Sequence, residues 1–456
     1  MQAIIIGGGI SGLICAYLLK RAGLQVRLLE QSNRFGGVIE TISQDGFQFE
    51  LGPQSFLSNE SVLEVVRTLG MESELLRADG KAPRFILLNG KLVQAPMGPG
   101  QLFSSPLFSA GTKFRLISEP FRKTFPPSGD ESLASFVRRK FGNDLLENLA
   151  GPFVSGIHAG DPEKLSVRSA FPFLREWEEK YGSVLKGAMK SRPPKGTPRP
   201  TLSSFRNGVG EFVQALRDAL GNDASSGATV EYVTMVKSGS AAAFEVTLQH
   251  NGAAETLTAP VVIVATDTVA AGKLLSPLSD TIAALLQRIE YAAVAVVGCG
   301  YRREQITNSV DGFGFLVPRK EKLRVLGTVY CSSLFPGRAP QGMVNLTSFV
   351  GGATDQQVMT TPEPELAAQA EREVANVLGI SGPPMTRVIR RWPRALPQYN
   401  LGHAEVVAGL QAELSKLPGL FLAGNYLSGA SIGYCTEHAT KTVAAVVSYL
   451  KSNLEK

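Results

Sequence analysis

The chain has 456 residues, of which 44% are hydrophobic and 19% charged, and it carries a formal net charge of +6. This length exceeds the size at which one hydrophobic core stops growing, so two or three globular domains are expected and overall disorder is excluded. No apolar run approaches the roughly eighteen residues of a membrane span, and no leader-like segment precedes the first predicted strand, so we expect a cytoplasmic protein.

The cysteines and histidines indicate neither a metal site nor a disulfide framework. The four cysteines lie far apart without a CxxC pair, and the four histidines lack ligand spacing. The positive charge suits an anionic substrate or an anionic membrane surface at least as well as a nucleic acid. Because no recognisable nucleic-acid-binding module accompanies the charge, we expect no nucleic-acid partner.

The first predicted element is a buried strand at residues 3–6 (AIII) that runs directly into Gly7, Gly9 and Gly12. These glycines open an apolar helix that ends near Gly23. The glycines let the backbone turn tightly and approach a pyrophosphate, while the N–H groups at the helix N-terminus face the phosphates. The stretch is therefore typical of a dinucleotide site.

Glu30 closes the next predicted strand, QVRLLE, eighteen residues after Gly12. Its carboxylate can accept hydrogen bonds from ribose hydroxyls and should repel a 2′-phosphate, which disfavours NADP. A glycine loop alone is also compatible with a tight turn in an ordinary α/β domain. Strand, spacing, helix and acid together favour the dinucleotide site.

The stretch NRFGGVIET distinguishes FAD from NAD. Arg34 can act as a charge-assisted donor to a phosphate, and Gly36 with Gly37 lets a second backbone segment approach the same pyrophosphate. An NAD domain has no need of this second clamp. We therefore expect FAD.

Two further segments are predicted to reach an extended cofactor. In FELGPQSF (49–56), a short strand is followed by a bend at Gly52 and Pro53. Near the C-terminus, a strand at 420–423 is followed by a Gly-Asn turn and a helix that starts near Ser431 or Ile432. In two-part flavin folds the partial positive charge of such a helix N-terminus stabilises the anionic reduced ring.

The middle of the chain indicates an interleaved organisation. Residues from 98 to about 190 are rich in predicted helices, and 189–204 form a basic, proline-rich loop. A turn and helix in FRNGVGEFVQALRDALG are followed by the strands TVEYVTMV, FEVTLQH and ETLTAPVVIVAT, which are predicted to extend the nucleotide domain. From about 280 to 410, alternating strands predict an antiparallel sheet, with a helix at 363–379.

These motifs resemble the oxygen-dependent protoporphyrinogen oxidase family within the amine-oxidase-like flavoproteins. The resemblance covers nearly the whole chain. It is carried by GGGISGL, ELGPQSF, VSGIHAGDPEKLSVRSAFP, FRNGVGEF, GFGFLVPRKE, LGTVYCSSLFPGRAP, FVGGATD, RRWPRALPQYNLGH and LPGLFLAGNYLSGASIGYC. The glycine loop is shared by the whole superfamily, whereas AGDPEKLS, GFGFLVPR and LPQYNLGH are more specific.

The resemblance implies an α/β and α+β fold in which a Rossmann-like FAD-binding domain is interleaved with an antiparallel-sheet substrate domain and a helical, membrane-associated domain. The implied FAD-binding domain comprises 1–80, 205–278 and 412–456. The substrate domain comprises 81–97 and 279–411, and the helical domain comprises 98–204. A homodimer is also expected.

The resemblance also assigns site residues. The FAD-binding positions are Gly7, Gly9, Ile10, Ser11, Gly12, Glu30, Gln31, Arg34, Gly36, Gly37, Val38, Gly52, Pro53, Gln54, Ser55, Val236 at the adenine, Trp392, Gly424, Ser431, Ile432 and Gly433. Arg84 is implied to receive a substrate propionate, and Leu316, Leu326 and Phe349 to sandwich the tetrapyrrole. Gln54 occupies a position at which family members carry different polar residues, and it is implied to be a further substrate contact. Each of these substrate roles has an alternative. The three apolar residues could serve ordinary sheet packing, and Arg84 could form a surface salt bridge.

The implied activity is oxidation of protoporphyrinogen IX to protoporphyrin IX, with FAD as hydride acceptor and oxygen as oxidant. No acid or base residue is required, because the flavin carries the redox chemistry. Coproporphyrinogen III, with four carboxylates, is the nearest alternative substrate, for which Arg302, Arg303, Arg319, Lys320 and Arg324 offer extra cations. An amine oxidase, a carotenoid desaturase and a non-catalytic flavin-binding protein are more distant alternatives.

Residues 98–125 intersperse apolar and cationic side chains. The apolar members are Leu102, Phe103, Leu107, Phe108, Phe114 and Leu116, and the cationic ones are Lys113, Arg115, Arg122 and Lys123. This pattern predicts either an interfacial surface for peripheral attachment to the inner face of the membrane or helix packing inside the domain. The sequence favours neither.

Overall fold

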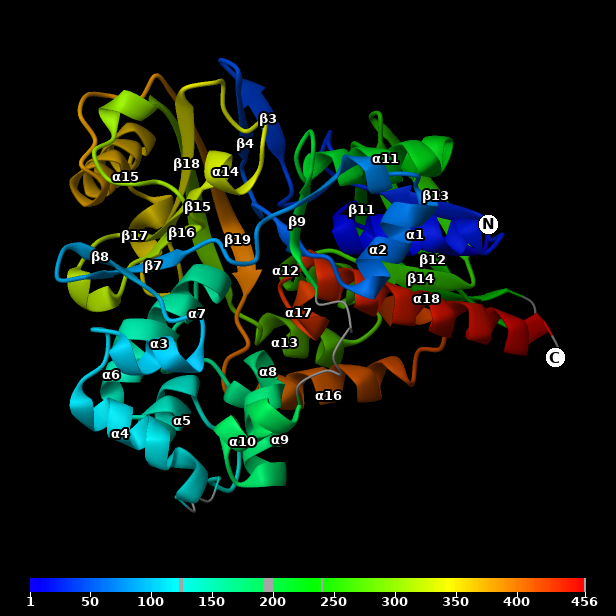
Figure 1. The fold of residues 1–456 in the computed structure, drawn as a ribbon. Helices are drawn as coiled ribbons and strands as arrows, with labels where there is room; N and C mark the ends of the chain where they lie inside the picture. The colour runs from blue at the N-terminus through cyan, green and yellow to red at the C-terminus, as the bar shows by residue number, and fades with distance from the viewer. Residues whose placement is uncertain (123–125, 192–199, 239–240, 455–456) are drawn as a thin grey trace.

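The structure, a computed structural model of the chain, describes residues 1–122, 126–191, 200–238 and 241–454. Figure 1 shows three regions: a nucleotide-type α/β region at the right, a large sheet at the upper left and a set of helices at the lower left. Several separate sheets are present, as the predicted mixed α/β organisation requires. Lys123 and most of the predicted proline-rich loop, residues 192–199, lie outside the described residues.

The first region, called here the parallel-sheet region, is built on five parallel strands. Their order is β10 (Ala224–Ser225), β2 (Val26–Leu29), β1 (Ala3–Ile6), β14 (Val261–Val264) and β20 (Leu420–Leu422). Every residue of β1 and β14 is buried, because helices or strands cover both faces of a parallel sheet. The strand predicted at 3–6 is therefore confirmed.

The helices on one face are α1 (Ile10–Arg21), α2 (Glu60–Thr68), α11 (Gly210–Leu220) and α18 (Ile432–Leu454), whose apolar residues share one core with β1. The opposite face packs against α12 (Thr268–Leu275), α13 (Asp280–Gln287) and α16 (His403–Leu414). Residues 280–287 and 403–411 were assigned to the substrate domain, but Ile282 and Leu410 bury their side chains against the parallel sheet.

The strands predicted to extend the nucleotide domain lie in two sheets. Strand β14 joins the parallel sheet, whereas β11 (Ala228–Ser238), β12 (Ala241–His250) and β13 (Ala253–Ala259) form an antiparallel sheet whose apolar residues share the core on the opposite face. Asn251 and Gly252 have φ values of +52° and +78°, which suit the tight hairpin turn between β12 and β13. Local hairpin pairing therefore forms the second sheet of this domain.

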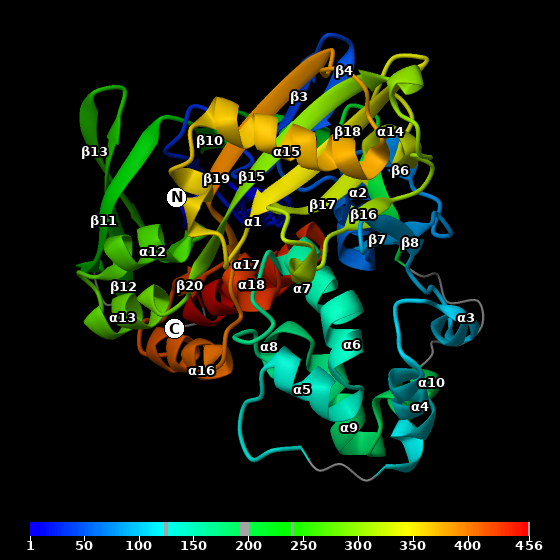
Figure 2. The same ribbon diagram turned by 90° about the vertical axis from the view of Figure 1, so that its left-hand side faces the viewer.

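The second region is a seven-stranded sheet. Its order is β19 (Thr386–Pro397), β15 (Tyr291–Arg302), β18 (Met343–Gly351), β17 (Val325–Tyr330), β16 (Gly314–Leu316), β7 (Arg84–Leu88) and β8 (Lys91–Gln94). Helix α15 (Glu363–Leu378) lies across one face (Figure 2). The antiparallel prediction holds except that β16 and β7 are parallel. These two strands are far apart in sequence, so no short connection forces them to be antiparallel.

Smaller elements join these regions. Strand β17 ends at Tyr330, and α14 (Cys331–Leu334) follows it directly. Strands β3 (Thr41–Gln44) and β4 (Phe47–Glu50) form a hairpin, and α17 covers Asn425–Ser428. Strand β9 (Leu202–Phe205) pairs with β5 (Phe56–Leu57) and β6 (Leu75–Arg77). Residues 202–204 therefore belong to this sheet and not to the helical domain to which they are assigned from the sequence.

The third region, the helical region, carries the predicted helix-rich segment. Its helices are α3 (Pro99–Ser104), α4 (Ala110–Ser118), α5 (Leu133–Lys140), α6 (Asn143–Leu145), α7 (Gly151–His158), α8 (Val167–Ala170), α9 (Pro172–Tyr181) and α10 (Val184–Lys190). Within the described part of the chain, no helix is both long enough and apolar enough to cross a bilayer.

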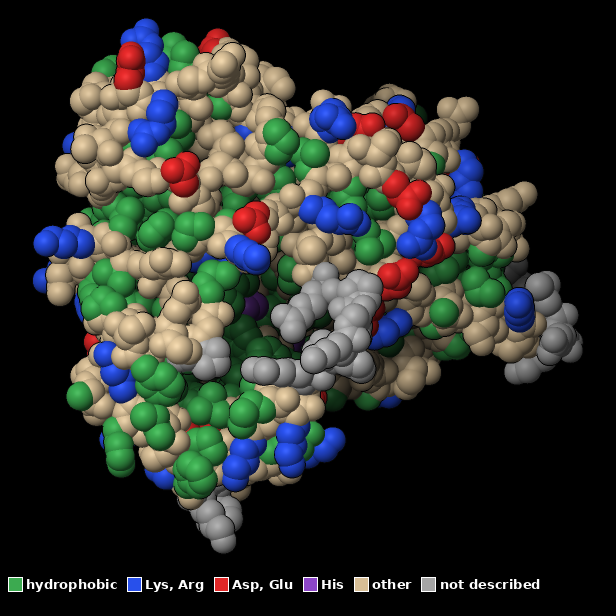
Figure 3. Space-filling view, in the orientation of Figure 1, with side chains coloured by type: hydrophobic (Ala, Val, Ile, Leu, Met, Phe, Trp, Pro, Cys, Tyr) green, Lys and Arg blue, Asp and Glu red, His purple; other side chains and the backbone are tan. Residues whose placement is uncertain are grey.

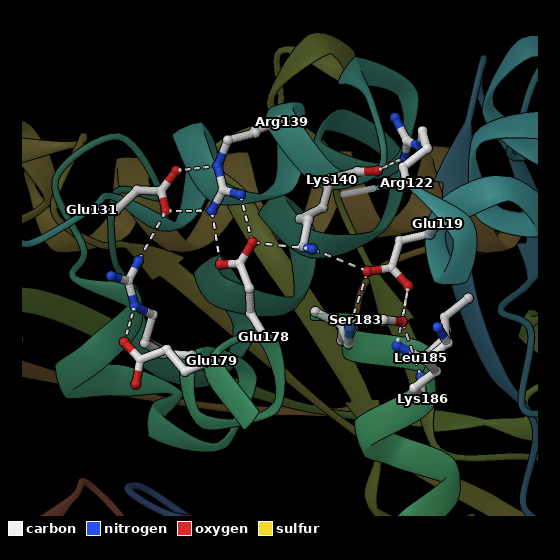
Figure 4. Close-up of polar contacts among 12 residues, drawn as sticks. Glu119, Arg122, Glu131, Arg139, Lys140, Glu178, Glu179, Ser183, Leu185 and Lys186 are labelled. Carbon is white, nitrogen blue, oxygen red and sulfur yellow. Dashed lines mark hydrogen bonds and ion pairs between the residues drawn. The ribbon is translucent and has the colours of Figure 1, made fainter. Parts of the chain in front are cut away.

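A buried ionic network holds the helical region together (Figure 4). Lys140 is 1% exposed, and its Nζ lies 3.2 Å from Glu119 Oε1 and 3.0 Å from Glu178 Oε1. Arg139 joins Glu178 to Glu131 at 2.6 and 2.7 Å. Because buried charges are tolerated only when they are paired, each member depends on the others.

We predict that Lys140→Met strongly destabilises the chain, by about 3–5 kcal/mol, because it leaves buried carboxylates without their shared cation. Arg138→Met on the same helix is the control, since Arg138 and its partner Glu163 are about half exposed. That control should cost below about 1 kcal/mol. Urea unfolding followed by circular dichroism measures both variants, and equal losses would contradict the prediction.

Candidate functional site

The carboxyl end of β1 carries the first glycine turn. Gly7 has φ +108°, and a Cβ on Gly12 would lie 1.9 Å from the Gly7 carbonyl oxygen, so α1 packs directly on the turn. By contrast, a Cβ on Gly9 would meet nothing within 4 Å. In the part of the chain that the structure describes, no side chain caps the N-terminus of α1. The helix therefore presents its first N–H groups, at Ile10, Ser11 and Gly12, to an open space that fits a pyrophosphate.

Glu30 follows β2 at the same edge of the sheet. Its Oε2 accepts a hydrogen bond from Gly8 N at 2.6 Å, and its Oε1 accepts from Ser32 N at 2.8 Å and Ser32 Oγ at 2.7 Å. The carboxylate is thereby held in place beside the glycine turn, with Gln31 exposed next to it. Two carboxylate oxygens offer about four acceptor positions, so capacity for ribose hydroxyls remains.

The second glycine segment lies directly beside the first. Gly36 N donates to Gly8 O at 2.8 Å, and Gly36 forms a bridge with Gly9. Gly36 and Gly37 have φ values of +105° and +60°, and a Cβ on Gly37 would lie 3.4 Å from Gly9 Cα. The structure thus brings the two predicted clamp segments together, and glycine is what permits their approach.

Arg34 stabilises the loop that contains it. Its Nη1 donates to Ile39 O at 2.9 Å, and its Nη2 donates to Gly37 O. The guanidinium carbon lies 5.4 Å from the centre of the Trp392 ring. Arg34 therefore orders the second glycine segment, and its direct contact with a phosphate stays a prediction.

The bend after β4 adjoins this loop. A Cβ on Gly52 would lie 1.9 Å from Val38 O, and Trp392 Nε1 donates to Leu51 O at 2.6 Å. Gln54 Nε2 donates to Glu50 O at 2.8 Å and to Gly52 O at 3.1 Å, while its Oε1 accepts from Cys331 Sγ at 3.2 Å. The Gln54 amide therefore closes the bend that also contains Pro53 and Ser55, and its contact with a substrate stays a prediction.

The C-terminal segment completes the same edge. Gly424 follows β20, and α18 begins at Ile432, as the sequence predicts. Ser431 Oγ accepts from Tyr434 N at 3.1 Å, and Asn59 Nδ2 donates to Gly433 O at 3.2 Å. Because β20 is parallel to β14 and β14 to β1, their carboxyl ends meet at one edge, where dinucleotides bind in α/β sheets.

Val236 does not join this cluster. Strand β11 meets Glu30 at its first residue, where Ala228 N donates to Glu30 O at 2.8 Å. Val236 lies eight positions further along β11, which is about 26 Å of extended chain. The structure therefore places Ala228 next to the predicted ribose site, and the contact of the Val236 backbone with the adenine stays a prediction that this spacing disfavours.

The predicted apolar substrate residues share one face of the seven-stranded sheet. Phe349 on β18 is opposite Gly327 on β17, which is opposite Leu316 on β16. Leu326 occupies an irregularity between β17 and β18, and bulges redirect side chains. Leu326 and Phe349 consequently belong to one apolar cluster with Trp392, on the face opposite α15.

Helix α7 contributes residues that sequence reasoning missed. A Cβ on Gly156 would lie 2.4 Å from Leu316 Cδ2, so α7 lies directly against the apolar face. Phe153 and Ile157 of α7 are 45% and 48% exposed. Figure 3 shows hydrophobic side chains around a hollow where the helical region meets the two sheets. In the sequence these residues look like ordinary core residues of a helix, so no signal distinguished them.

Arg84 begins β7, opposite Gly314 of β16 and two positions from Ile86, which is opposite Leu316. It therefore shares the face of the apolar residues. Its side chain lies 5.0 Å from the Phe313 ring centre and donates to Met97 Sδ at 3.4 Å. Among the described residues no carboxylate pairs with Arg84. The surface salt bridge considered as an alternative is therefore not formed.

Comparisons with known proteins agree with this geometry. The family model of flavin-containing amine oxidoreductases matches residues 10–447. The chain belongs to this family. Protoporphyrinogen oxidase 1, chloroplastic, of Spinacia oleracea is 34% identical over 484 residues, covering 100% of this chain and 86% of the relative. Coproporphyrinogen III oxidase of Bacillus subtilis is 30% identical, covering 99% of each chain.

Solved structures show the same fold. A crystal structure assigned to a protoporphyrinogen oxidase of Exiguobacterium sp. 255-15 has a TM-score of 0.82 at 24% identity and 99% coverage of both chains. Cyclohexylamine oxidase of Brevibacterium oxydans has a TM-score of 0.71 at 18% identity. The chain is thus an FAD-dependent oxidoreductase of the protoporphyrinogen oxidase family, and the open space at Gly9 fits this cofactor.

Substitutions at Gly9 and Gly12 distinguish an effect on FAD binding from an effect on the stability of the fold. We predict that Gly9→Ala leaves the thermal unfolding of the FAD-free chain unchanged, because its Cβ meets nothing within 4 Å. It should weaken FAD binding at least tenfold, since the new methyl group enters the pyrophosphate space. Gly12→Ala should instead lower the unfolding temperature, because its Cβ would lie 1.9 Å from Gly7 O.

Calorimetry of the FAD-free chains and fluorescence titration with FAD measure the two effects. If the Gly9→Ala chain bound FAD as tightly as the original chain, the predicted position of the pyrophosphate beside Gly9 would be wrong.

Proposed function

We propose that the chain oxidises protoporphyrinogen IX to protoporphyrin IX with oxygen as the final acceptor. The observation that carries this proposal is Arg84, which stands without a carboxylate partner among the described residues at the end of an apolar face. A porphyrinogen is a large apolar ring with carboxylate arms, so its site needs apolar walls and few well-placed cations. The names of the relatives support the same substrate class.

The residues of the site position the substrate. Leu316, Leu326 and Phe349 hold the ring plane, while the Arg84 guanidinium pairs with a propionate. Bound FAD supplies a two-electron acceptor, so three successive oxidations need no acid or base from the chain. The ring must present different meso carbons to the flavin in turn. An apolar face allows this rotation better than directional hydrogen bonds would.

Coproporphyrinogen III is the second candidate, because a relative of that name matches the chain over 99% of both lengths. The cations considered for its extra carboxylates are largely engaged elsewhere. Arg319 lies 3.2 Å from Asp161, and Arg324 Nε and Nη2 donate to Asp355 at 2.8 and 3.1 Å. Arg303 donates to the carbonyl oxygens of Ile306 and Asn308. The engagement of these cations favours a dicarboxylate, and kcat/KM for the two porphyrinogens distinguishes the candidates.

We predict that Arg84→Ala lowers kcat/KM for protoporphyrinogen IX by tens- to several-hundred-fold and leaves the FAD content intact. Loss of an Arg–carboxylate pair in a partly desolvated site costs about 2–4 kcal/mol. Arg84→Lys should recover only part, because lysine loses the two-pronged geometry. Exposed Arg77 on β6 is the control position, and Arg77→Ala should change neither quantity.

The measurement is anaerobic bleaching of the bound flavin by porphyrinogen, followed by stopped-flow absorbance. An unchanged rate and affinity in Arg84→Ala would reduce Arg84 to an ordinary surface residue. A flavin in the original chain that porphyrinogen does not bleach would overturn the proposed function itself.

We further infer that the helical region attaches peripherally to an anionic membrane, on the cytoplasmic side. Leu107, Phe108 and Leu116 of the predicted segment are buried and serve helix packing, whereas Phe114, Ile117 and Phe121 are 70%, 55% and 83% exposed. Lys113 and Arg115 on α4 accompany these exposed residues. Figure 3 shows hydrophobic side chains with Lys and Arg beside them over this region. Aromatic residues among cations suit a headgroup boundary.

We predict that the chain floats with anionic vesicles at low salt and that replacing Phe114, Ile117 and Phe121 together by Ser abolishes flotation. Met235 on β11, 49% exposed and distant in the fold, provides the control Met235→Ser. A triple variant that floats as well as the original chain would assign these side chains to another role.

A further inference from the structure

Arg338 lies in the loop between α14 and β18, yet only 1% of its surface is exposed. Burying a guanidinium is costly unless its donors are bonded. The partners of Arg338 therefore indicate what its burial achieves. Among the described residues, its hydrogen-bond acceptors lie outside the seven-stranded sheet, on β4, on β9 and at the residue after β9.

The guanidinium joins the loop before β18 to two separate segments, β4 and the end of β9. Its Nη2 donates to Ser204 Oγ at 2.8 Å and to Phe205 O at 2.9 Å, and its Nη1 donates to Arg206 O at 3.1 Å. Nη1 also donates to the Gln48 side chain on β4. Figure 1 shows β4, β9 and α14 meeting where the large sheet adjoins the parallel-sheet region.

The backbone around Arg338 strengthens the same junction. Gln48 N donates to Arg338 O at 3.1 Å. Asn345, fully buried on β18, donates from Nδ2 to Gln48 O at 2.7 Å and to Arg338 O at 3.0 Å. At the start of α14, Cys331 Sγ donates to Gln54 Oε1 at 3.2 Å. The connection from α14 to β18 is thus bonded at several residues to the segment from β4 to the bend.

The connection that contains Arg338 leads to the apolar substrate face, and the segment to which it is bonded leads to the cofactor. Residues 331–342 connect β17 with β18, the strands that bear Leu326 and Phe349. Strand β4 leads directly into the bend at Gly52, which packs on Val38 and the second glycine segment. The Arg338 contacts therefore join the strands of the apolar face to the cofactor segment. They act beside the hydrogen bond from Trp392 Nε1 to Leu51 O and the packing of Phe47 and Phe49 with Val388.

We propose that Arg338 is a positioning residue for flavin reduction: it holds the bend at Gly52–Ser55 at a fixed separation from the strands that bear Leu326 and Phe349. The kinetic part of this inference rests on the proposed porphyrinogen oxidation, and the structural part rests on FAD alone. Displacement of a reacting group by about 1 Å lowers a rate by about a hundredfold. A substrate-binding residue would show its effect on affinity, whereas a positioning residue shows it on the rate at saturation.

The test compares Arg338→Met with Arg324→Met. Arg324 precedes β17 and is also mostly buried, but its partners Asp355, Thr361 and Gln369 all belong to the same region as the seven-stranded sheet. We expect Arg338→Met to lower the rate of flavin reduction at saturating protoporphyrinogen IX by ten- to a hundredfold. The substrate Kd should change less than threefold, because Arg84 and the apolar face remain. Arg324→Met should lower the unfolding temperature without this change in rate.

Two measurements on the bound flavin need no substrate. We expect Arg338→Met to alter the visible circular dichroism of the flavin and to raise the rate of FAD dissociation at least tenfold, with Arg324→Met unchanged in both. If porphyrinogen fails to reduce the original chain, the proposed function is wrong, while these two measurements still decide the role of Arg338. Equal behaviour of the two methionine variants would overturn the proposal.

Two further variants address folding. Glu50, 3% exposed, lies 3.8 Å from Arg338 Nη2, so the Arg338→Met chain would retain a buried carboxylate. Combining Arg338→Met with Glu50→Gln removes this charge and should keep the slow reduction. Ser204→Ala removes one acceptor only and should slow flavin reduction several-fold in a fully folded chain. A Ser204→Ala chain and a double variant that both reduce at the original rate would contradict the positioning role.

Discussion

Close contact between backbone segments at the carboxyl edge of the parallel sheet is the constraint on which the site depends. Four glycines allow it: Gly7 and Gly12 bring α1 onto the end of β1, while Gly36 and Gly52 bring two loops against the same turn. A methyl group at Gly12 or Gly52 would lie 1.9 Å from a carbonyl oxygen. Glycine at these positions therefore determines packing first, and the open space at Gly9 is what remains for the cofactor.

The substrate side follows a different physical rule. Its residues come from strands, so the alternation of side chains and one irregularity in β17 decide which of them face the site. Helix α15 packs on the other face of the sheet in an ordinary apolar core. Leu326 and Phe349 therefore lie on the face predicted to bind the substrate. The ring site is thus a consequence of sheet geometry, whereas the cofactor site is a consequence of turn geometry.

Local patterns predicted much of this from the sequence. The strand at 3–6, the helix start at Ile432 and the helix at 363–379 all follow from short-range signals, and the structure confirms them. The sequence did not predict the long-range arrangement: the pairing of β11–β13 in a sheet of their own, the parallel pairing of β16 with β7 and the packing of α13 and α16 on the parallel sheet. The residue at which β11 meets Glu30, Ala228, likewise depends on tertiary register.

The order of strands in the parallel sheet also bears on how the chain is made. Strand β1 is formed from residues 3–6, yet its neighbour β14 ends at residue 264 and the last strand, β20, at residue 422. During synthesis the N-terminal half therefore emerges with strand edges that lack their partners, and such edges are prone to aggregation. Because α18 shares one core with α1, the edge predicted to hold FAD is assembled only after β20 and α18 have been synthesised.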